Sequence, residues 1–327
     1  LKHHQTLRMH YANCNAYNAD FDGDEINVHF PQSELARAEC EVIAGTHEQY
    51  IVPTDGKPLR GLIQDHIDAS VKLSMADCFL SRDQFCQLVY ESVRPVIGLA
   101  SLDTSTVQPA LLKPEVLYTG RQLLSCVLAH VTRKHVSPRR EPLLRHFEGK
   151  AKVQAKAIGG ISGMDEPSVL VRRGLILRGV LDKASIGSSA NGLVHAVFEL
   201  YGGRAAADLL DALTRLLTSY LATVEGHTCG IGDLVLTDQA EQARKAIVEE
   251  TEQVGIEAME SFLKERGYKD WDAAGISSTE RARRRRDATH KALGEDGARE
   301  ALDAHMMGAL APQHSKIVKA CLPDGLG

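Results

Sequence analysis

The sequence predicts a mixed α+β fold, and three features of its 327 residues indicate this class. Residues 1–60 are punctuated by Asn, Asp, Gly and Pro between short runs such as 25–30, a pattern typical of loops and strands. Residues 61–215 alternate short helical and extended patterns. Residues 216–327 carry long helical patterns dense in Glu, Lys, Gln and Ala. We therefore expect three segments with these boundaries.

Local signals place the expected elements of the first two segments. A helix is expected over 32–44 with Ser33 as its N-cap residue, and the Asp-Gly pair between Pro53 and Pro58 marks a turn. Residues 95–114 read as a loop-rich connector, and 169–180 as a β-rich stretch with two central basic residues. Further helices are expected over 62–73, 81–91, 120–131, 192–201 and 208–221.

The last segment contains two long helical patterns. The first covers 238–267, and the second extends from a capping-box match at Ser277 and Glu280 towards Ala320, although two glycines weaken its middle. Two long helices joined by a short turn predict an antiparallel helical hairpin.

Composition limits the possible partners and compartments. Lys and Arg number 38 against 43 Asp and Glu, a net charge of −5, so the whole chain is not a basic nucleic-acid coat, although a local basic channel remains open. No run approaches the ~20 apolar residues of a membrane span, so no membrane partner is expected. The seven cysteines form no Cys-x-x-Cys pair, which indicates reduced intracellular thiols. Because the first residue is Leu and the final residues read as a mid-chain loop, we expect a longer parent protein.

The most informative residues are three aspartates, Asp20, Asp22 and Asp24, at alternate positions in a turn rich in Gly and Asn. Three carboxylates that converge on one point repel one another and need a cation. Oxygen ligands of this kind suit Mg²⁺, which keeps some of its waters and shares phosphate oxygens with a substrate. Gly23 lets the backbone bend so that alternate side chains can meet.

Alternative roles for this cluster would require different neighbouring residues. A solvated acidic turn requires nothing further and stays open. A calcium loop of the EF-hand type needs Gly after the third Asp and Glu at the twelfth position, where this chain has Glu25 and Pro31. An aspartyl-phosphate enzyme would usually place the cluster after an apolar strand, and residues 11–17 are a poor strand. Magnesium-assisted phosphoryl or nucleotidyl transfer remains the specific hypothesis.

The longer string 17–33 resembles the signature of the largest subunit of multisubunit DNA-directed RNA polymerases. Residues 18–24 match that signature without change, and Ile26 stands where Met is usual. The resemblance extends along nearly the whole chain, including 53–65, 179–187 and 230–233. Within the family, several stretches look most like RNA polymerase I, the nucleolar enzyme; they are 7–13, 29–31, 48–50 and 55–65.

The resemblance implies an architecture for the three segments. Residues 1–60 would be the C-terminal part of the active-site domain, of the double-psi-barrel type, with the metal loop. Residues 61–215 would form an α/β pore domain. Residues 216–327 would form the funnel, a long antiparallel helical hairpin.

The resemblance also implies roles for individual residues. Asp20, Asp22 and Asp24 would be the catalytic residues and would hold a permanent Mg²⁺ at the RNA 3′ end. Asn18 would bind substrate by contacting the ribose of RNA or of the incoming nucleotide, which helps to recognise the 2′-OH. A second Mg²⁺ would arrive with the nucleoside triphosphate. The implied activity is template-directed nucleotidyl transfer in the synthesis of the ribosomal RNA precursor.

Partners and location follow from the same resemblance. The expected partners are the second-largest polymerase subunit, other polymerase subunits, the DNA template, the RNA transcript and nucleoside triphosphates. A transcript-cleavage subunit or factor would bind at the funnel. The expected location is the nucleus, specifically the nucleolus, and activity is expected only within the multisubunit complex.

Two departures accompany the resemblance and leave alternatives open. Residues 1–7 do not clearly reproduce the family's upstream nucleotide-contacting element, and the chain stops before the expected bridge helix and trigger loop. A truncated, non-catalytic paralogue that acts as an assembly or interaction module is one alternative. The largest subunit of another nuclear RNA polymerase is the second.

Three further groups of residues allow either a functional or a purely structural role. The basic run 281–286 could contact RNA, a factor or an import receptor, or could be a solvated helical face. Lys183 and the pair Arg172 and Arg173 could line a nucleotide pore or form surface ion pairs. The fourteen histidines lack metal-ligand spacing, so no second protein metal site is expected.

Overall fold

The computed structural model describes residues 5–97, 104–136, 144–153, 166–228, 230–269, 271 and 275–322. The chain divides into two compact units, Leu1–Thr228 and Cys229–Gly327. Each unit has its own cluster of buried apolar side chains. Helices and small antiparallel sheets occur together, which confirms the mixed α+β class.

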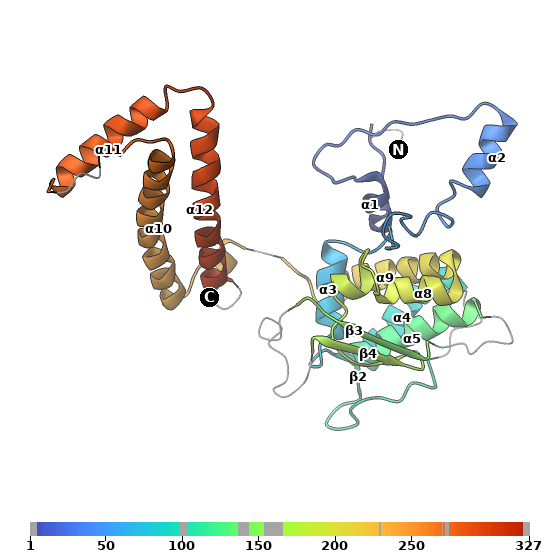
Figure 1. The fold of residues 1–327 in the computed structure, drawn as a ribbon. Helices are drawn as coiled ribbons and strands as arrows, with labels where there is room; N and C mark the ends of the chain where they lie inside the picture. Colours follow the sequence, from blue (N-terminus) through green and yellow to red (C-terminus); the bar gives the residue numbers. More distant parts are fainter. Residues whose placement is uncertain are drawn as a thin grey trace. The chain divides into compact units, whose positions relative to one another are not determined.

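The first unit contains most of the secondary structure (Figure 1). Its described helices, in chain order, are η1 (Tyr11–Asn13), α1 (Cys14–Tyr17), α2 (Glu34–Val42), α3 (Asp65–Ser74), α4 (Arg82–Ile97), α5 (Gly120–Lys134), α7 (Lys183–Ile186), α8 (Leu193–Tyr201) and α9 (Gly203–Thr223). Its strands pair antiparallel as β1 (Phe79–Ser81) with β2 (Leu117–Thr119), and as a sheet in the order β3 (His146–Lys150), β4 (Ser168–Arg172) and β5 (Leu175–Arg178).

The first 60 residues are less regular than their pattern suggested. Residues 1–60 were expected to be loop- and strand-like, and the run 25–30 is loop, because it forms no strand among the described residues. Its Val28 and Phe30 side chains are exposed, so the run has neither a paired neighbour nor a face to bury. The predicted helix at 32–44 is confirmed as α2, and the Ser33 hydroxyl caps it by accepting the Ala36 N–H at 3.2 Å.

The helices of the middle segment are confirmed with shifted ends. Helix α3 begins at Asp65, and Leu62 lies outside it and donates its N–H to the carbonyl of Ile186 at 2.9 Å. Helix α4 continues through Pro95, so the predicted connector starts later than expected. Pro95 has no N–H to donate to the carbonyl four residues earlier, and the helix ends two residues after it. Residues 98–103 of that connector lie outside the described residues.

The β-rich prediction for 169–180 is also confirmed. This stretch forms most of β4 and the whole of β5, which pair antiparallel around a turn at Arg173 and Gly174. Both turn residues have positive φ, 50° and 76°, which suits the two-residue turn of a twisted hairpin. The two central basic residues therefore lie at the tip of a hairpin.

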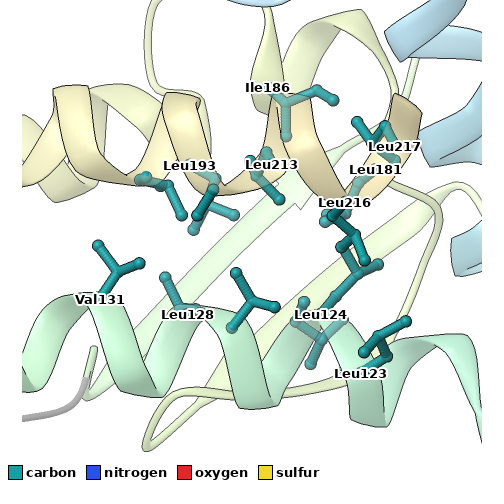
Figure 2. Close-up of a cluster of buried hydrophobic side chains, with 14 of the residues drawn as sticks. Leu123, Leu124, Leu128, Val131, Leu181, Ile186, Leu193, Leu213, Leu216 and Leu217 are labelled. Atoms are coloured by element: carbon teal, nitrogen blue, oxygen red, sulfur yellow. The ribbon is translucent and has the colours of Figure 1, made fainter. Parts of the chain in front are cut away.

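The core of the first unit is built between α5 and α9. Figure 2 shows leucines of the two helices facing one another, among them Leu124 and Leu128 from α5 and Leu213 and Leu216 from α9. Helix α5 begins with a capping box, in which the Thr119 hydroxyl accepts from the N–H of Gln122 at 3.2 Å. These leucines are buried, so the apolar area that they remove from water holds the helices together.

The second unit is helical in its described part. It contains η3 (Ile231–Leu234), α10 (Asp238–Glu265), α11 (Ser278–Ala292) and α12 (Ala298–Cys321). The second long helical pattern is therefore two helices and not one. The chain leaves α11 at Leu293, and Gly297 takes a positive φ of 68° before α12 starts.

Helices α10 and α12 lie side by side and run antiparallel (Figure 1). Glu250 bonds Lys316 at 3.1 Å, whereas Glu265, later in α10, lies 4.0 Å from His305, earlier in α12. The expected antiparallel pairing is present, but α11 intervenes between the two helices in place of a short turn. Apolar residues around the buried Trp271 form the core of this unit.

Three further expectations concern the segment boundaries, membrane-spanning helices and the cysteines. The expected boundary at 215 lies inside α9, whereas the two compact units meet after Thr228; the three-segment division stays a prediction. No described helix combines the length and apolar character that crossing a bilayer requires. No disulfide bond is found among the six described cysteines.

Removing one core leucine tests the α5–α9 packing. Leu216→Ala should lower the free energy of unfolding by about 2–5 kcal/mol, because the buried side chain would leave a cavity. Leu112→Ala is the matched control, since Leu112 is exposed, and should change it by less than about 0.5 kcal/mol. Urea unfolding followed by circular dichroism measures both values. Equal effects for the two variants would contradict this core assignment.

Candidate metal centre

The aspartate loop begins where helix α1 ends. Asn18 takes the left-handed conformation, with φ 47° and ψ 40°, and its N–H donates to the carbonyl of Asn15. The next N–H, of Ala19, donates to the carbonyl of Cys14 at 3.0 Å. Asparagine tolerates this conformation better than most residues. Asn18 therefore closes the helix and turns the chain into the loop.

The loop brings the three predicted aspartates together. One carboxylate oxygen from each of Asp20, Asp22 and Asp24 lies within 4.8 Å of the other two, and all three residues are exposed. The Asp20 N–H donates to Asp24 Oδ2 at 3.0 Å, and the Asp22 N–H donates to Asp20 Oδ1 at 3.3 Å. Gly23 has a φ of 120°, which side-chain-bearing residues rarely adopt. Backbone geometry thus gathers the carboxylates.

The close approach of these carboxylates changes how they hold protons. A hydrogen bond from the Asp22 side chain lowers the pKa of Asp20. The same hydrogen bond, and then repulsion from the Asp20 charge, raise the pKa of Asp22. Crowded carboxylates behave in this way because one proton relieves the repulsion between them. A bound cation would relieve it more completely.

The donor set fits Mg²⁺. All three side chains offer hard oxygen atoms, and their exposure leaves room for the waters that Mg²⁺ retains. A hollow of about 610 Å³ borders the loop and is lined by Asp20 and Asp24 among others. Elsewhere in the described parts of the chain, no group of three His, Cys, Asp or Glu residues has comparable spacing.

Polar residues before the loop fasten α1 to the body of the unit. Asn13 Oδ1 accepts from Arg60 Nε at 3.0 Å, and Asn15 Nδ2 donates to Ser188 Oγ at 2.8 Å. Sequence reasoning missed the supporting residues Arg60 and Ser188. They are 47 and 173 positions away from their partners, and no local pattern marks them.

Two other candidate groups lie outside the aspartate loop. Arg172 and Arg173 line a separate hollow of about 570 Å³ together with Arg145 and His146. Lys183 is the first residue of the short helix α7.

The basic run 281–286 lies on α11 of the second unit. Arg284 pairs with Glu280 at 2.9 Å, and Arg285 pairs with Glu260 at 2.7 Å. The charges of these two arginines are therefore balanced by glutamates, which gives both residues a structural role.

Comparison with known proteins matches nearly the whole chain to RNA polymerase sequences. Residues 49–234 match the family described as RNA polymerase Rpb1, domain 3, and residues 1–46 match RNA polymerase Rpb1, domain 2. The chain is 41% identical to DNA-directed RNA polymerase I subunit rpa1 of Schizosaccharomyces pombe over 98% of its own length. It is 39% identical to RNA polymerase I subunit RPA190 of Saccharomyces cerevisiae over 99%.

A class III relative matches over a shorter stretch. DNA-directed RNA polymerase III subunit RPC1 of Bos taurus is 32% identical over 72% of this chain. The chain spans 18% of the length of each of the two class I relatives and 16% of the class III relative.

Binding of a hard cation can be tested directly on this loop. Tb³⁺ takes oxygen ligands and is excited through nearby tyrosine rings, and Tyr17 lies just before the loop. We expect sensitised emission that Mg²⁺ suppresses. Asp22→Asn should weaken Tb³⁺ binding by at least about tenfold, since even changes outside the ligand set commonly cost that much.

The control for this titration is Asp55→Asn. Asp55 is an exposed aspartate that bonds Lys57 at 2.6 Å and lies outside the loop. Unchanged Tb³⁺ affinity in Asp22→Asn, or an equal loss in both variants, would contradict a metal centre at the three aspartates.

Proposed function

The chain belongs to the RNA polymerase Rpb1 family, and from this premise we propose that its three-aspartate loop is the metal-binding part of an RNA polymerase I catalytic centre. The observation that carries the proposal is the convergence of three carboxylates within 4.8 Å. This loop lies in the stretch that matches RNA polymerase Rpb1, domain 2.

The proposed reaction is template-directed nucleotidyl transfer. The RNA 3′-oxygen forms a bond to the α-phosphorus of a nucleoside triphosphate, the bond to the leaving pyrophosphate breaks, and the hydroxyl proton is released. Mg²⁺ bound at the loop would lower the pKa of the 3′-hydroxyl and neutralise charge on the phosphate. Asp20, Asp22 and Asp24 would hold that ion, and a second Mg²⁺ would enter with the triphosphate. No side chain of the loop is assigned as a general base.

Asn18 is proposed to contact the ribose. Its amide can both donate to and accept from a hydroxyl, which is what recognition of the 2′-OH requires. Its exposed position at the start of the loop supports this role, because the side chain is open to a ligand beside the metal centre.

The proposed activity belongs to a multisubunit complex. The partners would be the second-largest subunit, other polymerase subunits, template DNA and the RNA transcript. Large apolar side chains of the first 60 residues support such contacts, because Val28, Phe30, Leu35 and Val42 are each at least 70% exposed. Apolar surface of this kind is typical of protein contact sites.

The finer architecture is proposed on the same premise. Residues 1–60 would complete a double-psi-barrel-type domain, 61–215 would form the pore, and 216–327 would form the funnel. A transcript-cleavage subunit or factor would bind at the funnel. The location would be the nucleolus, where the enzyme would make the ribosomal RNA precursor.

Class I is favoured over other nuclear polymerases. Identity to the two class I relatives is 41% and 39%, against 32% for the class III relative. The intact aspartate cluster argues against a non-catalytic paralogue, because the loss of one carboxylate would already weaken metal binding.

Removing the aspartates tests the catalytic proposal. In polymerase purified through a tagged parent chain, Asp20→Ala, Asp22→Ala and Asp24→Ala together should reduce Mg²⁺-dependent incorporation at least about 100-fold. Asp55→Asn should leave incorporation unchanged. If the second-largest subunit co-purifies and the triple variant stays fully active, the activity comes from another polymerase and the proposal fails.

Two substitutions at position 18 separate the effect of losing the side-chain amide from the effect of straining the backbone. Asn18→Gly keeps the left-handed conformation without strain but removes the amide, whereas Asn18→Ala removes the amide and adds strain. Both should lower discrimination between ribo- and deoxyribonucleotides by about tenfold, the value of one lost hydrogen bond. Competitive incorporation of the two nucleotides measures this ratio. Wild-type discrimination in Asn18→Gly would exclude a ribose contact by the side chain.

A further inference from the structure

We propose that Tyr11 is a positioning residue for the aspartate loop. Its ring lies between Phe21 of the loop and His66 of α3, so a column of three rings links the carboxylates to the helical body. The inference rests on the proposed function, because the group that is positioned is the proposed magnesium site.

The outer end of this column is part of the metal loop itself. Phe21 stands between Asp20 and Asp22, and its ring centroid lies 5.6 Å from that of Tyr11 with a tilt of 35°. Because Phe21 is bonded through the backbone to both aspartates, a contact that holds its ring also restrains the backbone that carries their carboxylates. The Phe21 side chain is 58% exposed, so the contact with Tyr11 supports a ring that is otherwise largely in solvent.

The inner end of the column is fixed in the core. The Tyr11 and His66 ring centroids are 5.0 Å apart with a tilt of 56°. His66 is only 6% exposed, and its Nε2 lies 3.1 Å from Thr218 Oγ1. His66 belongs to α3 and Thr218 to α9, so two packed helices hold this end.

The backbone that carries Tyr11 is also restrained. Tyr11 opens the turn η1, whose cap is His10, and His10 Nδ1 accepts the Ala12 N–H at 3.1 Å. Two residues later, Asn13 is bonded to Arg60 at 3.0 Å. These hydrogen bonds therefore hold the backbone from which the Tyr11 ring extends.

A smaller side chain at position 11 would leave the loop unsupported. A hollow of about 550 Å³ borders both Tyr11 and His66. A shorter side chain at position 11 would enlarge this hollow, and no neighbouring group would replace the lost contact with Phe21. No hydrogen bond of the Tyr11 hydroxyl is found among the described residues, so phenylalanine should keep the function of the ring. An aromatic contact of this type changes an equilibrium constant by about three- to tenfold.

The test uses the assembled polymerase with substitutions in the tagged parent chain. Fe²⁺ placed at the magnesium site, with a reductant and peroxide, cuts the nearby backbone through hydroxyl radicals, and Mg²⁺ competes with it. Tyr11→Leu should raise the Mg²⁺ concentration that halves cutting near the loop by about three- to tenfold. Tyr11→Phe should behave as wild type.

Tyr90→Leu is the matched control for loss of a tyrosine ring. Tyr90 is half-buried like Tyr11 and belongs to the same unit, but its ring lies beside Arg94 of α4. This variant should leave both the Mg²⁺ competition and the Mg²⁺ dependence of nucleotide incorporation unchanged. An equal shift in Tyr90→Leu would make the effect of Tyr11→Leu a general loss of stability and would overturn the proposal.

Phe21→Leu keeps the proposal testable if Tyr11→Leu prevents assembly. Because Phe21 is largely exposed, this change leaves the core intact and should produce the same shift in Mg²⁺ competition. If an assembled Tyr11→Leu or Phe21→Leu enzyme needs the same Mg²⁺ concentration as wild type to halve Fe²⁺-dependent cutting, the positioning role is overturned. Failure of the proposed function is distinguishable, because the triple aspartate variant would then keep both incorporation and Fe²⁺ cutting.

Discussion

Repulsion between three carboxylates is the constraint on which the candidate site depends. Their oxygen atoms come within 4.8 Å of one another at exposed positions, and no positively charged side chain is bonded to them in the described part of the chain. Backbone amides of Asp20 and Asp22 and the positive φ of Gly23 impose this arrangement. These hydrogen bonds hold the loop in one geometry, so a cation that binds there would lose little free energy to ordering.

The rest of the first unit gives this loop a rigid base. Leucines of α5 and α9 form the buried centre, and α3 packs against α9 beside them. From this body, Arg60 and Ser188 reach the short helix α1, and His66 reaches Tyr11. A site that must hold an ion in one geometry gains from such support, because side chains on an isolated surface loop would be free to separate.

Local rules predicted much of the fold, and they failed where local and tertiary effects compete. Ser33 and Ser277 were predicted as helix caps and both accept the expected backbone N–H, because a cap depends on residues within one turn. The run 25–30 has the composition of a strand but forms none among the described residues, because strand formation needs a partner. Gly297 was expected only to weaken a helix, yet one helix ends before it and another begins after it, and this second helix packs along α10.

The sequence by itself determined the family, the three clustered carboxylates and the residue that opens their loop. Those features depend on seven consecutive residues, 18–24, whose chemistry and spacing are visible without a structure. Only the tertiary structure decided what supports them: Asn15 meets Ser188 across 173 positions, and Tyr11 meets the ring of His66. The physical reason is the distance along the chain over which each kind of interaction acts. Turn geometry and metal chemistry act between near neighbours, whereas contacts between distant residues exist only after helices have packed and brought their side chains together.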